Sequence, residues 1–574
     1  MPTTTQTAQE RYQSWLHNPV VDAQTHAELE AIANNPKEIE DRFYKDLDFG
    51  TGGLRGVMGA GSNRMNVYTI RKTAQGIANH LLQASSDTQA LSVVFAYDSR
   101  RNSQTFAEEA ALVFAANGIK AYVFDSLRPT PELSFAVRFL QTSAGVVITA
   151  SHNPPEYNGF KVYGPDGCQA VPELASRLKE SISRVDEFSN VKTISKEEAI
   201  AERLFAIIGE EVDAAYSRAV TNMLQRQEVV QAMGDQVAVL YTPLHGSGNL
   251  PVRRVLREAG FQHVYVVPEQ ELPDSEFSTV TSPNPEEHQA FTLAIAQADK
   301  TGTIDVIIGT DPDCDRVGVV IRDENGKYDV LNGNQTGALL CHYIVSAQKE
   351  KGVLPHNGVV IKTIVTSEFG AVIAKSFGVD VINTLTGFKY IGEKIGQFEQ
   401  TGEHRFLFGY EESYGYLAGT YARDKDAVVA SMLVCEMVAY YKQLGKTLHQ
   451  ALQDLYRQYG YFLEGLQSLT LKGIEGIRQI EQIMQRARSE MPSSIAGFQV
   501  EWVEDYKQGL YGLPKENVVK VYLQGDSWFC IRPSGTEPKL KVYFGTMQDS
   551  FGKATETLQT IQHAAMQMID GFQK

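Results

Sequence analysis

One serine and three aspartates suggest chemistry most clearly in this sequence. Ser151 lies in TASHNP (149–154), directly after the apolar run GVVI, where a strand-to-loop turn can present its hydroxyl group to a substrate. The segment lacks the GxSxG pattern of an α/β-hydrolase, so that class is excluded. Taken alone, the motif is also compatible with an ordinary turn in which Ser151 and Asn153 cap the backbone.

Asp311, Asp313 and Asp315 alternate in DPDCDR (311–316), directly after the apolar run VIIGT. Alternate side chains of an extended segment project to the same side, so we expect the three carboxylates to converge on one hard cation. Oxygen ligands of this kind suit Mg²⁺. A solvated acidic turn is the weaker interpretation, because neighbouring carboxylates repel one another unless a positive charge neutralises them. An EF-hand loop is excluded, since Arg316 and Arg322 occupy the positions that require Gly and Glu.

Two further segments have the composition of substrate-binding loops. RPSGTEP (532–538) places an arginine beside hydroxyl and backbone N–H donors that could hold a phosphate, although a Pro/Gly hairpin turn is an equal alternative. GYEESYG (409–415) offers two carboxylates and a hydroxyl group to a sugar. Taken alone, this second motif is more typical of an exposed acidic turn.

Two lysines follow aromatic residues in the similar segments NGFK (158–161) and TGFK (386–389). A partly desolvated lysine at either position could take part in proton transfer, whereas most lysines are solvated surface residues. Two nucleotide-binding patterns are rejected. GTGGLRG (50–56) has Arg55 where the dinucleotide fingerprint requires its last glycine, and GKT (445–447) lacks the first glycine of a P-loop.

Short apolar runs alternate with amphipathic stretches along most of the chain, which predicts βαβ units with buried parallel strands. Polar loops follow these strands in three successive modules. Ligands of open α/β sheets bind beyond the carboxyl ends of the strands, so we expect three α/β domains that contribute loops to one site. The expected strands are 92–96, 121–124, 145–149, 237–241, 264–267, 305–308, 359–361, 380–382 and 405–408; the expected helices are 69–82, 104–116, 251–259, 287–298, 337–349 and 425–444.

The two ends of the chain differ from the α/β modules in their pattern of polar and apolar residues. Residues 1–45 are polar with helical spacing and predict an N-terminal helical extension. After a linker expected near residues 463–472, a helix at 475–491, the strands KVYL, WFCI and KLKVYF, and a closing helix at 553–573 predict an α+β domain. The expected domains are therefore 1–205, 206–325, 326–462 and 463–574.

Composition excludes several classes of function. The 53 Lys and Arg residues and 69 Asp and Glu residues give a net charge of −16, which argues against general nucleic-acid binding and docking on an anionic membrane. Five scattered cysteines indicate no zinc site and suit a reducing compartment. The N-terminus has no apolar core typical of a secretory signal, and the apolar run 427–441 suits a buried helix. We therefore expect a cytoplasmic enzyme.

Taken in order, GTGGLRG, TASHNP, DPDCDR, GYEES and RPSGTEP resemble the motifs of the α-D-phosphohexomutase superfamily. The resemblance covers the chain from about residue 48 to the C-terminus. It implies three similar α/β domains and a C-terminal α+β domain around one central cleft. It also implies that Ser151 carries a phosphoryl group in the active enzyme.

The resemblance further implies a role for each matching position. Asp311, Asp313 and Asp315, with a phosphate oxygen on Ser151, would hold Mg²⁺. The other implied residues are Arg55, Lys161 and Arg316 at the reacting end, His152 beside the nucleophile with its role open, Lys389 for proton transfer or sugar orientation, Glu411 and Ser413 for sugar hydroxyls, and Arg532, Ser534, Gly535 and Thr536 for the non-reacting phosphate.

The implied reaction converts α-D-glucose 1-phosphate into glucose 6-phosphate through glucose 1,6-bisphosphate. The E-E-S form of the sugar loop resembles glucose-type members, while TPLHGSG and the long N-terminal extension resemble a branch that contains pentose-phosphate mutases. Mannose or pentose phosphates remain alternative substrates. A Mg²⁺-dependent sugar-phosphate phosphatase and a non-catalytic carbohydrate-binding protein are further alternatives. We expect small-molecule sugar phosphates as partners, no nucleic acid or membrane, and a monomer or weak dimer.

Overall fold

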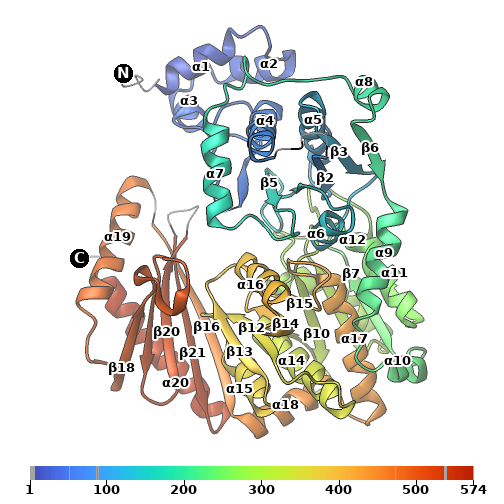
Figure 1. The fold of residues 1–574 in the computed structure, drawn as a ribbon. Helices are drawn as coiled ribbons and strands as arrows, with labels where there is room; N and C mark the ends of the chain where they lie inside the picture. Colours follow the sequence, from blue (N-terminus) through green and yellow to red (C-terminus); the bar gives the residue numbers. More distant parts are fainter. Residues whose placement is uncertain are drawn as a thin grey trace. The chain divides into compact units, whose positions relative to one another are not determined.

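In a computed structural model the chain forms two compact units. Figure 1 labels helices and strands of both. The first comprises Met1–Val320, Gly392–Gln400 and Gly415–Tyr440, and the second comprises Ile321–Ile391, Thr401–Tyr414 and Tyr441–Lys574. The structure describes residues 7–50, 52–85, 87, 90–471, 473–534 and 539–572.

The chain begins with three short helices, as the polar helical spacing predicted. A polar side chain caps the N-terminus of each helix, which satisfies backbone N–H groups that have no partner within the helix. Trp15 anchors this extension, since its ring centroid lies 5.3 Å from that of Tyr68 and 5.2 Å from that of Phe188. The helices are α1 (Ala8–Leu16), α2 (Ala23–Ala31) and α3 (Pro36–Phe43).

The first α/β domain contains a sheet with the strand order β1-β5-β4-β2-β3-β6. Strands β4, β2, β3 and β6 are parallel, whereas β5 and β1 run antiparallel to their neighbours. Val93 and Phe95 of β2 pack in one apolar cluster, and Val94 and Ala96 pack in another, so this strand is buried on both faces as its apolar run predicted. The elements are β1 (Gly53–Val57), α4 (Val67–Ala84), β2 (Ser92–Tyr97), α5 (Ser103–Ala116), β3 (Lys120–Phe124), α6 (Thr130–Phe139), β4 (Ala144–Ile148), β5 (Tyr157–Tyr163), α7 (Pro172–Ser183), α8 (Lys196–Ala201) and β6 (Phe205–Ile208).

Strand β1 was not expected, because its glycines carry no apolar pattern. It pairs with β5, and Gly53 lies opposite Lys161. A Cβ atom on Gly53 would lie 2.1 Å from the carbonyl oxygen of Phe160, so the close approach of the two strands requires glycine there.

The second α/β domain contains β10, β9, β7 and β8 in this order, with β9, β7 and β8 parallel and β10 antiparallel. The single helix expected at 287–298 is instead a 3₁₀ turn followed by a helix. The elements are α9 (Glu210–Thr221), α10 (Gln227–Met233), β7 (Ala238–Thr242), α11 (Asn249–Ala259), β8 (His263–Val266), α12 (Pro268–Glu271), η1 (His288–Phe291), α13 (Thr292–Thr301), β9 (Val306–Thr310) and β10 (Val317–Arg322).

In the second unit, β13, β12 and β14 form a parallel sheet in this order. The bounds in this part of the chain are β11 (Tyr328–Leu331), α14 (Gly333–Glu350), β12 (Gly358–Thr363), α15 (Phe369–Ser376), β13 (Asp380–Thr384), α16 (Phe388–Thr401), β14 (Arg405–Glu411), β15 (Gly415–Ala418), α17 (Ala427–Gln443) and α18 (Leu448–Tyr459).

Helix α17 confirms the expected buried helix, since its residues 427–439 are buried. Within the described part of the chain, no single helix is long and apolar enough to cross a membrane. Helices α17 and α18 reach the required length and apolar composition only when they are taken together, and the pair is bent by 86° at the break between them.

The C-terminal domain is an antiparallel sheet with the order β16-β21-β20-β19-β18-β17, and α19 and α20 contribute to its apolar core. The linker expected near 463–472 is wrong, because residues 461–470 form β16 and pair with β21 along their whole length. A polar edge strand needs backbone pairing but no apolar run, so its composition resembled a linker. The elements are β16 (Tyr461–Thr470), α19 (Gly473–Ser489), β17 (Ser494–Ile495), β18 (Phe498–Asp505), η2 (Tyr506–Gln508), η3 (Leu510–Gly512), β19 (Val519–Leu523), β20 (Ser527–Pro533), β21 (Lys539–Gln548) and α20 (Phe551–Phe572).

Candidate active site

Ser151 lies in a tight turn just beyond the carboxyl end of β4. Its φ of 54° is in the left-handed region, which non-glycine residues seldom adopt. Its Oγ donates a hydrogen bond to Oδ2 of Asp311 at 2.8 Å and lies 3.2 Å from Nδ1 of His152. The structure therefore brings the predicted serine directly to the predicted aspartate loop, 160 residues further along the chain.

Arg100 and Asp98 hold this turn, and the sequence analysis did not single them out. Arg100 donates to the backbone carbonyls of Ser151 at 2.6 Å and Pro154 at 2.8 Å. Its Nε lies 3.3 Å from Oδ2 of Asp98, which accepts a hydrogen bond from Thr149 at 2.6 Å. Both charged side chains are fully buried. The signal in the sequence was an oppositely charged pair in YDSR (97–100), directly after an apolar strand.

Asp311, Asp313 and Asp315 converge, and their ligand atoms all lie within 4.8 Å of one another. The expected convergence is present, but the expected extended backbone is wrong. The segment is a tight turn in which the Cys314 N–H donates to the carbonyl of Asp311 at 2.9 Å, and Cys314 has a φ of 55°. Folding the loop back, rather than alternation along a strand, brings the carboxylates together.

The donor set of the three aspartates fits a hard divalent cation. Oδ1 of Asp313 and Oδ1 of Asp315 are buried, and no hydrogen-bond donor within the described residues reaches them. Burial, and then the charges of Asp313 and Asp315, raise the pKa of Asp311 well above its usual value. Buried carboxylate oxygens without donors are costly unless a positive charge compensates them, and Mg²⁺ prefers oxygen ligands.

Two ammonium groups lie against the same carboxylates. Nζ of Lys161 is 2.7 Å from Oδ2 of Asp313 and 3.2 Å from Oδ2 of Asp315, and Nζ of Lys425 is 3.1 Å from Oδ2 of Asp315. Burial disfavours the charge of Lys161, but Asp313 and Asp315 outweigh it and raise the lysine pKa. In turn, the lysines outweigh burial and lower the pKa of Asp313 and Asp315.

Lys161 is therefore not a solvated surface lysine, and Lys425 is a further site residue. Lys425 was not predicted as a site residue, because it lies in RDKD (423–426) just before the apolar helix α17. The sequence does show alternating charges at the edge of a long apolar run, and this pattern could have indicated that Lys425 is a site residue.

Arg55, Arg316 and His152 surround the serine turn. Arg55 on β1 donates to Oδ1 of Asn153 at 3.1 Å. Arg316 follows the aspartate loop and forms an ion pair with Glu286. Burial, followed by the positive charges of Arg316 and Arg55, lowers the pKa of His152 well below its usual value. The first unit thus gathers every predicted residue of the reacting end.

The second unit holds the predicted sugar loop. Glu411 ends β14 and accepts a hydrogen bond from the Gly387 N–H at 2.8 Å. Lys389 lies on the first turn of α16 and is 7% exposed, so it is also not a solvated lysine. Oε2 of Glu412 accepts a hydrogen bond from Thr366 at 2.9 Å. The predicted Ser413 follows directly after Glu412 in this loop.

The predicted phosphate loop lies in the same unit, after β20. The Ser534 N–H donates to the carbonyl of Lys539 at 2.7 Å. Burial opposes the charge of Arg532, but Tyr543 and then Glu516 raise its pKa, and the charge of Glu412 in the sugar loop acts in the same direction. The other two residues predicted for this loop, Gly535 and Thr536, lie outside the described residues.

Four domain families match consecutive parts of the chain. They are "Phosphoglucomutase/phosphomannomutase, alpha/beta/alpha domain I" at residues 46–189, domain II at 214–326, domain III at 332–459, and the "C-terminal domain" at 481–551. A curated relative, "Phosphoglucomutase" of Staphylococcus haemolyticus (strain JCSC1435), is 39% identical over 530 residues, which are 90% of this chain and 94% of the relative. "Phosphoglucomutase" of Staphylococcus aureus (strain MSSA476) is 38% identical and covers 91% of this chain and 94% of its own length.

Solved structures share the fold. A "putative phosphomannomutase from Thermus Thermophilus" aligns with a TM-score of 0.69 at 23% identity, over 92% of this chain and 99% of that one. The open form of "pp63/parafusin (Phosphoglucomutse) from Paramecium" aligns with a TM-score of 0.69 at 16% identity, over 92% and 95%. The expected fold class, three similar α/β domains followed by a C-terminal α+β domain, is confirmed.

Proposed function

Because the chain belongs to the phosphoglucomutase/phosphomannomutase family, we propose that it interconverts α-D-glucose 1-phosphate and glucose 6-phosphate through a phosphoserine at Ser151. The observation that carries the proposal is the contact between the Ser151 hydroxyl and Asp311, at the edge of three converging carboxylates. Phosphoryl transfer depends mainly on positioning and on neutralising charge, and this arrangement supplies both.

In the proposed reaction, the bond between phosphorus and Oγ of Ser151 breaks while a bond forms to the free hydroxyl group of the sugar phosphate. The hydroxyl proton leaves in the same step and is returned to Oγ of Ser151, which becomes a hydroxyl group again. The resulting glucose 1,6-bisphosphate turns around and returns its other phosphoryl group to Oγ. His152 lies 3.2 Å from Oγ, and we assign it to proton transfer at the serine. Lys161 and Arg55 neutralise the phosphoryl oxygens.

Asp311, Asp313 and Asp315 would hold Mg²⁺, whose positive charge would polarise the phosphoryl group. The chain itself orients these ligands. The backbone N–H groups of Asp315 and Arg316 each donate to Oδ1 of Asp311 at 3.0 Å. Lys161 and Lys425 form ion pairs with Asp313 and Asp315 and so help to hold these two carboxylates in place.

We assign sugar and phosphate recognition to residues of the second unit. The Gly387 N–H orients Glu411. Glu411 and Ser413 would accept and donate hydrogen bonds to sugar hydroxyls, with Lys389 beside them. Arg532 and Ser534 would hold the phosphate that does not react, together with Gly535 and Thr536.

The test is mass spectrometry combined with two assays. Protein incubated with glucose 1,6-bisphosphate and digested is expected to show phosphate on the Ser151 peptide. Ser151→Ala is expected to lose roughly a thousandfold or more in kcat, because the covalent step has no other nucleophile. The matched control Ser183→Ala, at an exposed serine, should keep full activity. A Ser151→Ala variant with most of its kcat would overturn the mechanism.

A sugar-phosphate phosphatase is separated from a mutase by following isomer formation and free phosphate together. We expect isomer formation that requires the bisphosphate and releases little phosphate. A kcat/KM panel over glucose, mannose, N-acetylglucosamine and ribose 1-phosphates ranks the substrates, and we expect glucose first. A higher value for mannose or ribose would replace the substrate assignment and leave the chemistry intact.

Three further expectations remain proposals. The domain boundaries after residues 205, 325 and 462 can be checked by limited proteolysis. A monomer or weak dimer can be checked by light scattering. The cytoplasmic location fits five buried thiols, because free thiols persist in reducing compartments.

A further inference from the structure

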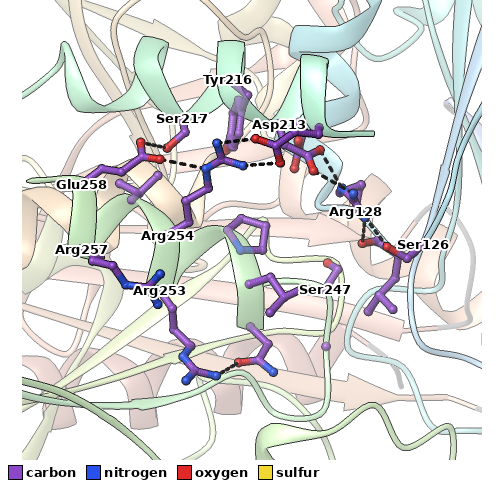
Figure 2. Close-up of a pocket in the computed structure, with 18 of the residues that line it drawn as sticks. Ser126, Arg128, Asp213, Tyr216, Ser217, Ser247, Arg253, Arg254, Arg257 and Glu258 are labelled. Atoms are coloured by element: carbon purple, nitrogen blue, oxygen red, sulfur yellow. Dashed lines mark hydrogen bonds and ion pairs between the residues drawn. The ribbon is translucent and has the colours of Figure 1, made fainter. Parts of the chain in front are cut away.

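A cavity of about 800 Å³ lies in the first unit, and the described residues that line it include none that are assigned to the reaction (Figure 2). Helices α9 and α11 form two of its walls, and loops at residues 126–128, 246–247 and 272–273 complete it. Its volume is in the range of sites that bind small organic ligands. Nothing in the proposed reaction uses this cavity.

Two arginines of the cavity are already neutralised. Arg254 forms two hydrogen bonds with Glu210, both at 2.9 Å, and another with Glu258 at 2.9 Å. Arg128 forms two hydrogen bonds with Asp213, both at 2.8 Å. These paired contacts build the wall near α9, as Figure 2 shows, and leave no net positive charge there for a ligand.

Arg253 and Arg257 lie one helical turn apart on α11 and are differently placed. Arg253 extends away from Arg254 and bonds to Oδ1 of Asn249 at 3.2 Å and Oε1 of Glu271 at 2.6 Å (Figure 2). No residue that the structure describes forms an ion pair or side-chain hydrogen bond with the guanidinium of Arg257. Arg253 is thus paired with the Glu271 carboxylate, as Arg254 is with Glu210, and Arg257 is the cavity arginine that has no carboxylate partner among the described residues. A phosphate at this turn of α11 would meet the unpaired guanidinium of Arg257 and the remaining N–H groups of Arg253.

The cavity also has an exposed apolar wall. Leu250 is 69% exposed and Leu272 is 71% exposed, although both are large apolar side chains. Pro251, Val255 and Pro273 line the same cavity. Exposed apolar side chains gathered around a cavity are typical of a ligand site.

An acidic residue at the cavity does not repel an anion. Glu132 is 1% exposed, and burial followed by the charge of Asp213 raises its pKa well above the usual value. Its surroundings therefore favour the protonated, neutral form of Glu132, and Asp213 is paired with Arg128. The other arginines that line the cavity each have a carboxylate partner, so Arg257 is the guanidinium that an anionic ligand can engage.

We propose that this cavity binds a phosphate monoester that carries an aromatic base, of the nucleoside monophosphate class, with its phosphate at Arg257 beside Arg253 and its flat base against Leu250 and Leu272. A bidentate guanidinium suits a phosphate, and an aromatic ring covers more apolar surface than a sugar does. We further propose that this ligand regulates the mutase reaction. This second proposal rests on the proposed function.

The cavity is physically joined to the aspartate loop. The N–H and Oγ of Ser247 both donate to the carbonyl of Pro312, at 2.8 and 2.9 Å. Two residues beyond Arg128, the Thr130 N–H donates to the carbonyl of Asp313 at 2.9 Å, and its Oγ1 donates to Oδ2 of Asp313 at 3.1 Å. A ligand that shifts either cavity loop therefore moves the carboxylates that the reaction uses.

The test is calorimetric titration of the full-length protein with AMP, at fixed free Mg²⁺ and with glucose 1,6-bisphosphate present to occupy the active site. We expect one AMP bound per chain. Arg257→Gln is expected to weaken binding about tenfold or more, since one charged partner of the phosphate is lost. The matched control Arg184→Gln removes an exposed arginine of the same unit and should leave AMP binding unchanged. Both variants should keep their thermal unfolding temperature and basal activity.

Adenosine carries only the base and ribose of AMP, and inorganic phosphate carries only its phosphate, so the two compounds test the two parts of the site separately. Each is expected to bind more weakly than AMP, and Leu272→Ser is expected to weaken AMP and adenosine but not phosphate. No AMP binding, or equal binding by Arg257→Gln, would overturn the site. Equal affinity for phosphate and AMP would overturn the apolar contact.

The effector role has a separate readout. AMP is expected to change kcat/KM of the wild type by about fivefold or more, and to leave Arg257→Gln unaffected. Unchanged kcat/KM in the wild type, with AMP bound, would overturn the effector role. The calorimetric result does not depend on mutase activity, so failure of the proposed function at Ser151 and failure of this site are distinguishable.

Discussion

Glu132 shows how burial sets the protonation state of single residues in this protein. Its carboxyl group is almost completely inaccessible and lies beside Asp213. Burial opposes ionisation of both residues, but Arg128 outweighs it and lowers the pKa of Asp213, while the pKa of Glu132 is raised. The surroundings therefore favour the ionised form of Asp213 and the protonated form of Glu132.

The raised pKa of Glu132 predicts how the free energy of unfolding depends on pH. The folded protein keeps the Glu132 proton above the ordinary glutamate pKa of 4.5, at which the unfolded chain has lost half of it. The folded state then binds more protons, so wild-type stability falls as pH rises above that value. Glu132→Gln keeps the shape of the side chain and has no proton to lose. Its free energy of unfolding is expected to rise relative to wild type by up to about 1.4 kcal/mol per pH unit.

Urea unfolding of both proteins between about pH 5 and pH 8 measures this difference, since these values lie above the ordinary glutamate pKa. Glu197→Gln, at an exposed first-turn position of α8, is the control and should give a flat difference. Parallel curves for Glu132→Gln and wild type would show that Glu132 ionises in the folded protein.

Residue types alone indicated part of the candidate site. Ser151 and the three aspartates stand out because hydroxyl and carboxylate groups directly follow apolar strands. Arg100 and Lys425 do not stand out, because a charged residue near an apolar run is common. Their importance depends on contacts with Pro154 and Asp315, which lie far away in the chain.

At the scale of elements, helix α17 shows why a charge can interrupt an apolar run. Glu436 is fully buried within it, and its carboxylate accepts hydrogen bonds from the backbone N–H groups of Gln225 at 3.0 Å and Arg226. Arg226 directly precedes α10, so the glutamate of one helix caps the N-terminus of another. A carboxylate there satisfies unpaired N–H groups and complements the helix dipole.

Replacing this cap is expected to destabilise the first unit. Glu436→Leu leaves buried N–H groups without an acceptor, which costs roughly 1–3 kcal/mol for each group. Glu436→Gln retains one acceptor oxygen and is expected to cost less. Denaturant unfolding followed by circular dichroism measures both. If the leucine variant is as stable as wild type, water or another acceptor replaces the carboxylate.

At the scale of the whole molecule, charge is distributed unevenly. The chain has a net charge of −16, yet Lys161, Lys425, Arg316 and Arg100 gather around the serine turn and the aspartate loop of the first unit. An acidic protein can therefore concentrate its positively charged side chains at the place where an anionic substrate would bind.

The two compact units predict two unfolding events. Trp15 is buried against Tyr68 and Phe188 in the first unit, and Trp528 is buried in a cluster of the second. Removing a buried aromatic side chain costs about 3–5 kcal/mol. In scanning calorimetry, Trp15→Ala is expected to lower one transition and Trp528→Ala the other. A single transition that both variants lower equally would show that the units unfold together.

The sequence by itself determined the order of the motifs, the parallel strands and the buried helix α17, because apolar periodicity and turn residues act over short stretches of chain. It did not determine strands β1 and β16, whose formation depends on pairing with distant strands. Only the tertiary structure decided that Ser151 meets Asp311 and that Lys425 joins them. The same holds for Arg257, whose place in a cavity depends on packing between helices. Such contacts between distant residues follow from the packing of the whole fold, which no local pattern records.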